Sequence, residues 1–248
     1  MPDLYRYARP LLWSVKPETA HRLALSALRG GLGVLPSSRQ ARQADPPILA
    51  QTLWGLHFTN PIGVAAGFDK DGLAPDEILR LGFGCIEVGT VTPQPQKGNP
   101  QPRLFRLDAD GAIINRMGFP SAGLDVVARR LARHRKRYGI VGVNLGKNRN
   151  SEDAAADYAE GIRRMSAIAD YLVVNISSPN TPGLRRLRSL STEPGSIRPR
   201  PLATPAPPVL RHGSPIRRQT GFPYRMVQAP CPYNSATSLQ THHWFLSV

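Results

Sequence analysis

The sequence has only two cysteines, Cys85 and Cys231, and it has no run of eighteen apolar residues. Two cysteines can form neither a disulfide framework nor a zinc cluster, and so few of them suit a reducing cytosol. The missing apolar run excludes a membrane-spanning helix, and the absence of an uninterrupted apolar segment at the N-terminus predicts no signal peptide. No GxGxxG motif opens a helix after the first predicted strand, which argues against a Rossmann dinucleotide site.

Acidic residues are scarce as well, since 32 Lys and Arg stand against 17 Asp and Glu, a net charge of +15. An excess of this size usually indicates a nucleic acid or an anionic membrane as partner. Residues 186–248 contribute 8 Arg, one Glu, no Lys and no Asp, and they hold 10 of the 25 prolines. A boundary near Arg186 therefore separates two compositions. A chain of 248 residues can form one large domain or two small ones.

Two segments near the N-terminus, residues 4–15 and 18–35, space their apolar residues as helices do. Gly30 and Gly31 favour the end of the second helix. Basic residues lie among the apolar ones in both segments. The pair could pack on the main domain or rest on a membrane surface, and the pattern alone favours packing.

Four short apolar runs follow, and each has Gly, Ser, Thr or Asn at or next to its end: residues 61–68, 84–92, 139–146 and 171–178. Helical patterns lie between them, at residues 75–82, 122–139 and 151–169. This alternation predicts βα units around a parallel sheet. Half of a (β/α)₈ barrel would show four such units with polar residues at the strand ends. In that fold the active site lies at the carboxyl ends of the strands. A doubly wound sheet is the competing architecture.

The polar side chains at these strand ends are candidates for a site. Thr90 follows the second run, and Asn144 and Asn175 end the third and fourth. A buried Asn without a partner costs free energy, so a polar ligand with amide and carbonyl groups would explain the pair. Lys70 follows the first run; a loop lysine is often solvated, and both readings stay open. Asn115 precedes a glycine in a turn before a helix.

Five motifs, in order, resemble those of the dihydroorotate dehydrogenase family: AAGFDKDG, GFGCIEVGTVTPQPQKGNPQPRLFRL, INRMGF, GVNLGKN and NISSPNTPGLR. The resemblance is to the quinone-dependent, membrane-associated class (class 2), and it covers about residues 4–185. It implies an α/β fold of the (β/α)₈ TIM barrel family, here the first four βα units after an N-terminal helical subdomain. It also implies oxidation of dihydroorotate to orotate, with FMN and a quinone as electron acceptor, in de novo pyrimidine (UMP) biosynthesis.

The same resemblance implies a role for residues in each motif. The FMN cofactor would contact Ala66, Gly67, Lys70, Thr90, Asn144 and Asn175. The substrate would contact Lys70, Asn115, Arg116, Met117, Gly118, Phe119, Asn175 and Asn180. Ser178 would be the catalytic base, where the soluble class uses Cys. No metal is expected.

The partners that the resemblance implies are dihydroorotate and orotate, a membrane quinone and a peripheral membrane surface, with no nucleic acid. These partners favour a membrane surface for the N-terminal helices, whereas the pattern alone favoured packing on the main domain. They also place the protein at the cytoplasmic face of the inner membrane. We therefore expect a membrane- and quinone-associated segment over residues 1–46 and the N-terminal half of an FMN-binding barrel over 47–185.

Residues 186–248 do not match the family. Its second half would supply another Lys in a strand resembling VKIAPDL, then Gly-rich loops around the FMN phosphate, and neither occurs here. The composition is typical of GC-rich DNA read out of frame; a disordered basic tail is the alternative. We expect little regular structure, few contacts with the barrel half, and weak FMN binding without turnover by this chain. Two other functions remain open: an FMN barrel acting on another pyrimidine, and a half-barrel that binds nucleic acid or acidic partners.

Overall fold

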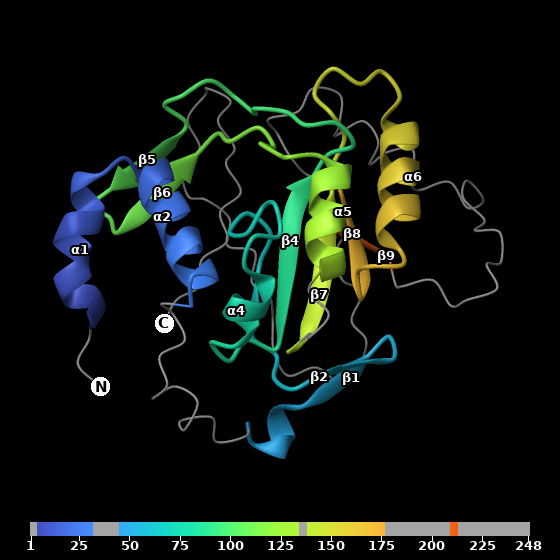
Figure 1. Cartoon of the computed structure of the whole chain (residues 1–248), viewed down its shortest axis with the longest axis horizontal. Helices are drawn as coiled ribbons and strands as arrows, with labels where there is room; N and C mark the ends of the chain where they lie inside the picture. Colours follow the sequence, from blue (N-terminus) through green and yellow to red (C-terminus); the bar gives the residue numbers. More distant parts are fainter. Residues whose placement is uncertain (1–3, 32–44, 134–137, 177–208, 213–248) are drawn as a thin grey trace.

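A five-stranded parallel sheet forms the centre of the protein (Figure 1). The computed structural model describes residues 4–31, 45–133, 138–176 and 209–212. The strands lie side by side in the order of the sequence: β3 (Gly63–Val64), β4 (Cys85–Val91), β7 (Ile140–Leu145), β8 (Tyr171–Asn175) and β9 (Val209–His212). The first four match the predicted apolar runs.

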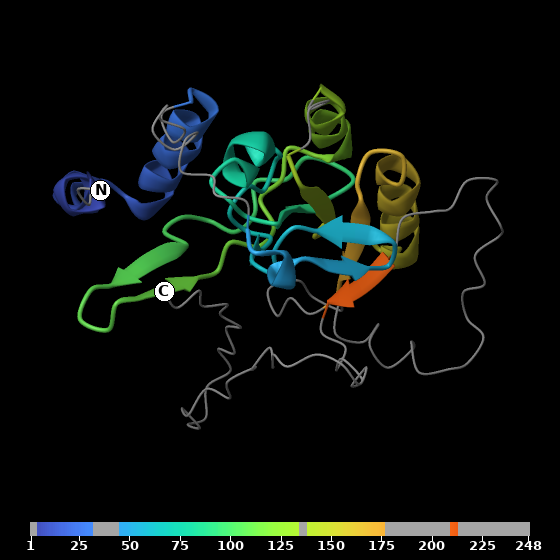
Figure 2. The ribbon, with the colours of Figure 1, turned by 90° about the horizontal axis from the view of Figure 1, so that it is seen from below.

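Three helices cover one face of this sheet (Figure 2): α4 (Pro75–Leu79), α5 (Leu124–Arg133) and α6 (Ala154–Met165). Alternate strand residues such as Ile86, Val88 and Val143 are fully buried and belong to the same hydrophobic core as apolar residues of the helices. A doubly wound sheet would reverse its strand order and carry helices on both faces. The sequential order and the single helical layer are instead those of a barrel segment, so the predicted fold class is confirmed.

Two hairpins were not predicted. After the short helix η1 (Pro47–Leu49), β1 (Gln51–Leu53) and β2 (Leu56–Phe58) pair antiparallel and lie at the amino end of the sheet (Figure 1). Trp54 and Gly55 join them with positive φ angles of 53° and 77°, the conformation of a tight hairpin turn. A second hairpin, β5 (Leu104–Leu107) with β6 (Ala112–Asn115), extends from the loop after β4.

The predicted pair of N-terminal helices is confirmed as α1 (Leu4–Ser14) and α2 (Pro17–Arg29). Arg106 of β5 donates to the carbonyl oxygens of Leu12 (3.1 Å) and Val15 (3.0 Å), and the Trp13 indole donates to Asp108 (2.6 Å). The pair therefore packs on the β5–β6 hairpin. The second helix was expected to reach residue 35, but it ends before Gly30, and residues 32–44 lie outside the described residues.

An ion pair also ties α2 to this hairpin. Arg103 bonds the Glu18 carboxylate at 2.5 Å, and both side chains are largely buried. The hydrogen bond from Arg103 holds the pKa of Glu18 below its usual value. Partial burial strengthens such a pair relative to one in open solvent.

The expectation of few contacts between the tail and the barrel half is wrong for residues 209–212. Strand β9 runs parallel to β8, with Leu172 opposite Val209 and Asn175 opposite His212. Two prolines precede it, which is compatible with the first position of a strand. The unpaired edge of β8 offers N–H and C=O groups to any short extended segment. Residues 209–212 begin with two apolar residues, and such a segment can pair with this edge. The rest of the tail lies outside the described residues.

Candidate functional site

Three predicted side chains meet at the carboxyl ends of adjacent strands. The Thr90 hydroxyl donates to Asn144 Oδ1 at 2.7 Å. The Asn175 amide donates to both Thr90 Oγ1 and Asn144 Oδ1 at 3.1 Å. Asn144 is 1% exposed, whereas Asn175 is only partly buried. The cluster is thus anchored by Asn144 inside the sheet and reaches the surface through Asn175.

Sequence reasoning missed Glu87, which lies beneath this cluster. Its carboxylate accepts the Nδ2 hydrogen of Asn144 at 2.7 Å, and the Tyr171 hydroxyl lies close to it. Burial raises the pKa of Glu87, while the hydrogen bond from Asn144 and the neighbouring Tyr171 hydroxyl lower it. Because the Asn144 amide donates to Glu87 and its oxygen accepts from Thr90, the amide has one fixed orientation. An acidic residue inside the apolar strand CIEVGTV was the signal that could have revealed it.

Gly142 makes room for this contact. The strand register places Gly142 between Glu87 and Tyr171 on adjacent strands. A Cβ atom on Gly142 would lie 2.1 Å from the Tyr171 ring, so only glycine lets the ring pass across β7 to the carboxylate. The contact between Tyr171 and Glu87 therefore depends on a glycine at position 142.

The loop after β3 joins the site from the other side. The Gly67 N–H donates to the Gly89 carbonyl at 2.9 Å, and the Lys70 ammonium donates to the Gly67 carbonyl at 2.5 Å. Burial lowers the pKa of Lys70. The Asp69 carboxylate accepts two backbone N–H groups at the start of α4 and so fixes the loop. This arrangement places Lys70 beside the strand end that carries Thr90, and Ala66 is partly buried in the same loop.

The predicted substrate segment, residues 115–119, starts at the end of β6 and leads towards the cluster. Its Phe119 ring is partly buried and packs against the core, and a Cβ on Gly146 would lie 2.5 Å from Thr90 Cγ2 and 3.3 Å from this ring. Phe119 is therefore a neighbour of Thr90. The Arg116 guanidinium donates to the Pro102 carbonyl at 2.9 Å, so its hydrogen bonds serve the loop. The Met117 carbonyl accepts a backbone N–H at 2.9 Å.

Ser178 and Asn180 lie outside the described residues. Ser178 follows Asn175 by three residues, so the chain leaves β8 at the cluster. Among the described residues, no helix is both long and apolar enough to cross a membrane. Within that same part of the chain, no group of three His, Cys, Asp or Glu side chains could hold a metal ion.

Comparison with known proteins gives consistent matches. The family model described as dihydroorotate dehydrogenase matches residues 48–195. The dihydroorotate dehydrogenase (quinone) of Rhodospirillum rubrum is 56% identical over 188 residues, which are 76% of this chain and 50% of that protein. The protein of the same name from Parvibaculum lavamentivorans is 55% identical over 187 residues, 75% of this chain and 52% of that protein.

The same similarity appears among solved structures. The crystal structure of DHODH from Eimeria tenella in complex with ferulenol has a TM-score of 0.63 and 48% sequence identity. The match covers 70% of this chain and 47% of that one. The chain thus spans about half the length of the curated relatives it matches.

Proposed function

Because the chain belongs to the dihydroorotate dehydrogenase family, we propose that it carries the N-terminal half of a site that oxidises dihydroorotate to orotate. FMN would accept the electrons and pass them to a quinone, in pyrimidine biosynthesis. The observation that carries this proposal is the hydrogen-bonded cluster of Thr90, Asn144 and Asn175 at the carboxyl end of the strands. In barrels of this type chemistry occurs at that end.

The residues present fit a flavin. A flavin ring carries carbonyl oxygens and an N–H group at its edge, and the cluster offers amide and hydroxyl groups that pair with both. Gly67 has a positive φ of 113°, and a Cβ there would meet no atom within 4 Å, so a ligand can approach its backbone. Lys70 would supply a cation at this position. When bound, the flavin supplies the two-electron redox chemistry that amino-acid side chains lack.

The chain's own groups would hold the substrate and move one proton. Oxidation of dihydroorotate removes a proton from one ring carbon and a hydride from its neighbour. Ser178 Oγ would take the proton, and because serine is a weak base at its free pKa, it needs a well-aligned C–H bond and an outlet for the proton. Asn175 and Asn180 would align the ring, since each amide matches one carbonyl and one N–H of a pyrimidine dione.

The N-terminal helices would meet the membrane and the quinone. Both pack on the β5–β6 hairpin through polar groups, yet Leu11 and Leu23 are 72% and 53% exposed. Exposed leucines among basic residues suit the surface of an anionic bilayer. We therefore propose peripheral attachment at the cytoplasmic face of the inner membrane. The expected division into residues 1–46, 47–185 and 186–248 is part of the same proposal.

Two proteins test the activity: the 248-residue chain, and a fusion in which residues 186–248 are replaced by the C-terminal half of the Rhodospirillum rubrum relative. Flavin absorbance measures FMN binding, and dye-coupled turnover with dihydroorotate and a quinone measures activity. We expect the fusion to bind FMN and turn over, and the chain alone to bind weakly without turnover. Ser178→Ala in the fusion should abolish most turnover and leave the flavin bound. A folded fusion that binds FMN but does not oxidise dihydroorotate would contradict the proposal.

A further inference from the structure

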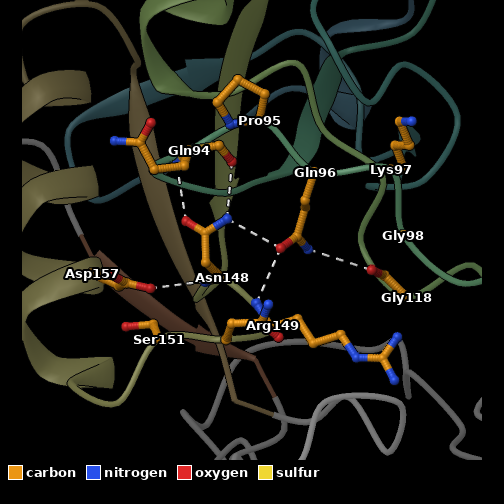
Figure 3. A pocket seen from close by; sticks show the side chains of 11 residues that line it. Gln94, Pro95, Gln96, Lys97, Gly98, Gly118, Asn148, Arg149, Ser151 and Asp157 are labelled. Atoms are coloured by element: carbon orange, nitrogen blue, oxygen red, sulfur yellow. Dashed lines mark hydrogen bonds between the residues drawn. The ribbon is translucent and has the colours of Figure 1, made fainter.

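Gln96 and Asn148 connect three loops at the carboxyl end of the sheet (Figure 3). Gln96 lies in the loop after β4 and Asn148 in the loop after β7, and the third loop is residues 116–121. The Asn148 amide donates to Gln96 Oε1 at 3.0 Å. The two side chains line an open hollow of about 440 Å³. We refer to this pair as the amide clamp.

The Gln96 side chain reaches two of these loops. Its Nε2 donates to the Phe119 carbonyl at 2.8 Å, and its Oε1 also accepts the backbone N–H of Arg149 at 3.0 Å. The Gln96 backbone exchanges two hydrogen bonds of 3.0 Å with Ser121. One residue therefore ties the 116–121 loop to the loop after β7.

Asn148 anchors the clamp on a helix. Its Oδ1 accepts the Gln94 N–H and its Nδ2 donates to the Gln94 carbonyl, both at 2.9 Å. Its own backbone N–H donates to the Asp157 carboxylate of α6 at 2.8 Å. The side-chain amide thus has a donor and an acceptor role that cannot be exchanged without losing these bonds.

The 116–121 loop needs such support because of its backbone. Gly118 and Phe119 have φ angles of 69° and 54°, and a side chain in this left-handed region costs roughly 1–2 kcal/mol. The hydrogen bond to the Phe119 carbonyl holds this conformation. The same residue places its ring beside Gly146 and Thr90, so the clamp acts at the border of the strand-end cluster.

We propose that Gln96 and Asn148 are positioning residues, which hold the 116–121 loop in the shape that contacts the pyrimidine ring. The inference rests on the proposed function, since the substrate role of this loop belongs to it. Among the described residues, none of the side-chain hydrogen bonds of the clamp goes to Asn144 or Asn175. It should therefore affect binding of the pyrimidine and leave binding of the flavin unchanged.

Two isosteric variants and one control separate these effects. Gln96→Glu keeps the acceptor for Asn148 and Arg149, but it places an oxygen against the Phe119 carbonyl. Asn148→Asp keeps the acceptor for Gln94 N–H and loses both donated bonds. Gln94→Glu is the matched control, because it makes the same chemical change at an exposed side chain that joins the clamp only through its backbone.

Hydrogen exchange of the 248-residue chain, followed by mass spectrometry on peptides that cover residues 114–123, reports the loop directly. We expect about tenfold faster exchange in the two clamp variants and no change in the control, since losing a partly buried hydrogen bond and adding repulsion opens the loop more often. Calorimetric titration of the fusion protein described above with orotate, at saturating FMN, should show about tenfold weaker binding when the fusion carries a clamp substitution. The FMN affinity should stay within about twofold.

Unchanged exchange in both clamp variants would overturn the inference, and so would a loosened loop with unchanged orotate affinity. An equal loss of FMN and orotate affinity would also overturn it, because that result indicates general unfolding of the site. If the fusion without clamp substitutions binds no orotate, the proposed function fails, and the exchange comparison in the 248-residue chain alone then decides whether the clamp holds the loop.

Discussion

Replacing Glu87 tests the layer that lies under the strand-end cluster. Glu87→Leu would leave the Asn144 amide without its acceptor and would remove the carboxylate beside the Tyr171 hydroxyl. An unsatisfied buried donor costs about 1–3 kcal/mol, so the loss of the acceptor is expected to lower the free energy of unfolding by about that amount. Leucine also removes a carboxylate that burial disfavours, which moves the expected value towards the lower end. Glu87→Gln keeps an acceptor oxygen and should cost about 1 kcal/mol or less.

The charge of Glu87 gives a second, pH-dependent test. Burial raises its folded-state pKa above the unfolded value of 4.5. The carboxyl therefore costs nothing below that value, where it is protonated in both states. It destabilises the fold increasingly as pH rises through the folded pKa, by about 1.4 kcal/mol for each unit of difference. The stability of Glu87→Gln relative to the natural chain should therefore increase as pH rises above 4.5, and it should level off once pH exceeds the folded-state pKa.

Urea denaturation at several pH values measures both effects, since other titrating groups cancel in the difference between two proteins. The midpoint for Glu87→Leu should lie well below that for Glu87→Gln at every pH. Equal midpoints for the two variants would show that Asn144 and Tyr171 do not depend on Glu87. If the difference in the free energy of unfolding between Glu87→Gln and the natural chain does not change with pH, then the ionised Glu87 carboxylate does not destabilise the fold.

Three further outcomes follow from other parts of the structure. Glu18→Gln should lower the free energy of unfolding by about 1–2 kcal/mol at pH 7, because it weakens the ion pair with Arg103. The bond to Arg103 lowers the pKa of Glu18, so this difference should shrink as pH falls below 4.5 and the carboxylate becomes protonated; urea titrations at pH 7 and over the acidic range check this. Burial raises the pKa of Cys85 to about 11, so with the other cysteine changed to serine, thiol labelling at pH 8 should be about a hundredfold slower than for a free thiol. Gly142→Ala should cost about 1–3 kcal/mol, because its Cβ would displace the Tyr171 ring, and thermal unfolding measures the loss.

Much of the fold could be predicted because its elements are local. Apolar runs that end in polar residues gave the four strands, and the spacing of apolar residues gave the helices between them. The end of α2 at Gly30 was predictable in kind, since glycine favours a helix stop. The hairpins were missed because β1 and β2 span only three residues each, too few for a periodic pattern.

The candidate site was predictable where it consists of strand ends. Parallel strands bring their carboxyl ends to one edge, so Thr90, Asn144 and Asn175 had to lie near one another once the sheet was assigned. The role of each residue came from the five family motifs and remains a prediction. Strand β9 was missed because proline-rich composition argues against regular structure, whereas pairing needs only a short extended segment beside an open edge.

The sequence by itself determined the parallel βα order, the polar strand ends and the family of the chain, since all three are written in local patterns and in motifs that keep their spacing. Only the tertiary structure decided which side chains depend on one another across strands and loops. Glu87 and Tyr171 are 84 positions apart, and they meet because the register leaves Gly142 between them. Hydrogen bonds between distant residues are set by strand register and loop geometry, which local sequence patterns do not encode.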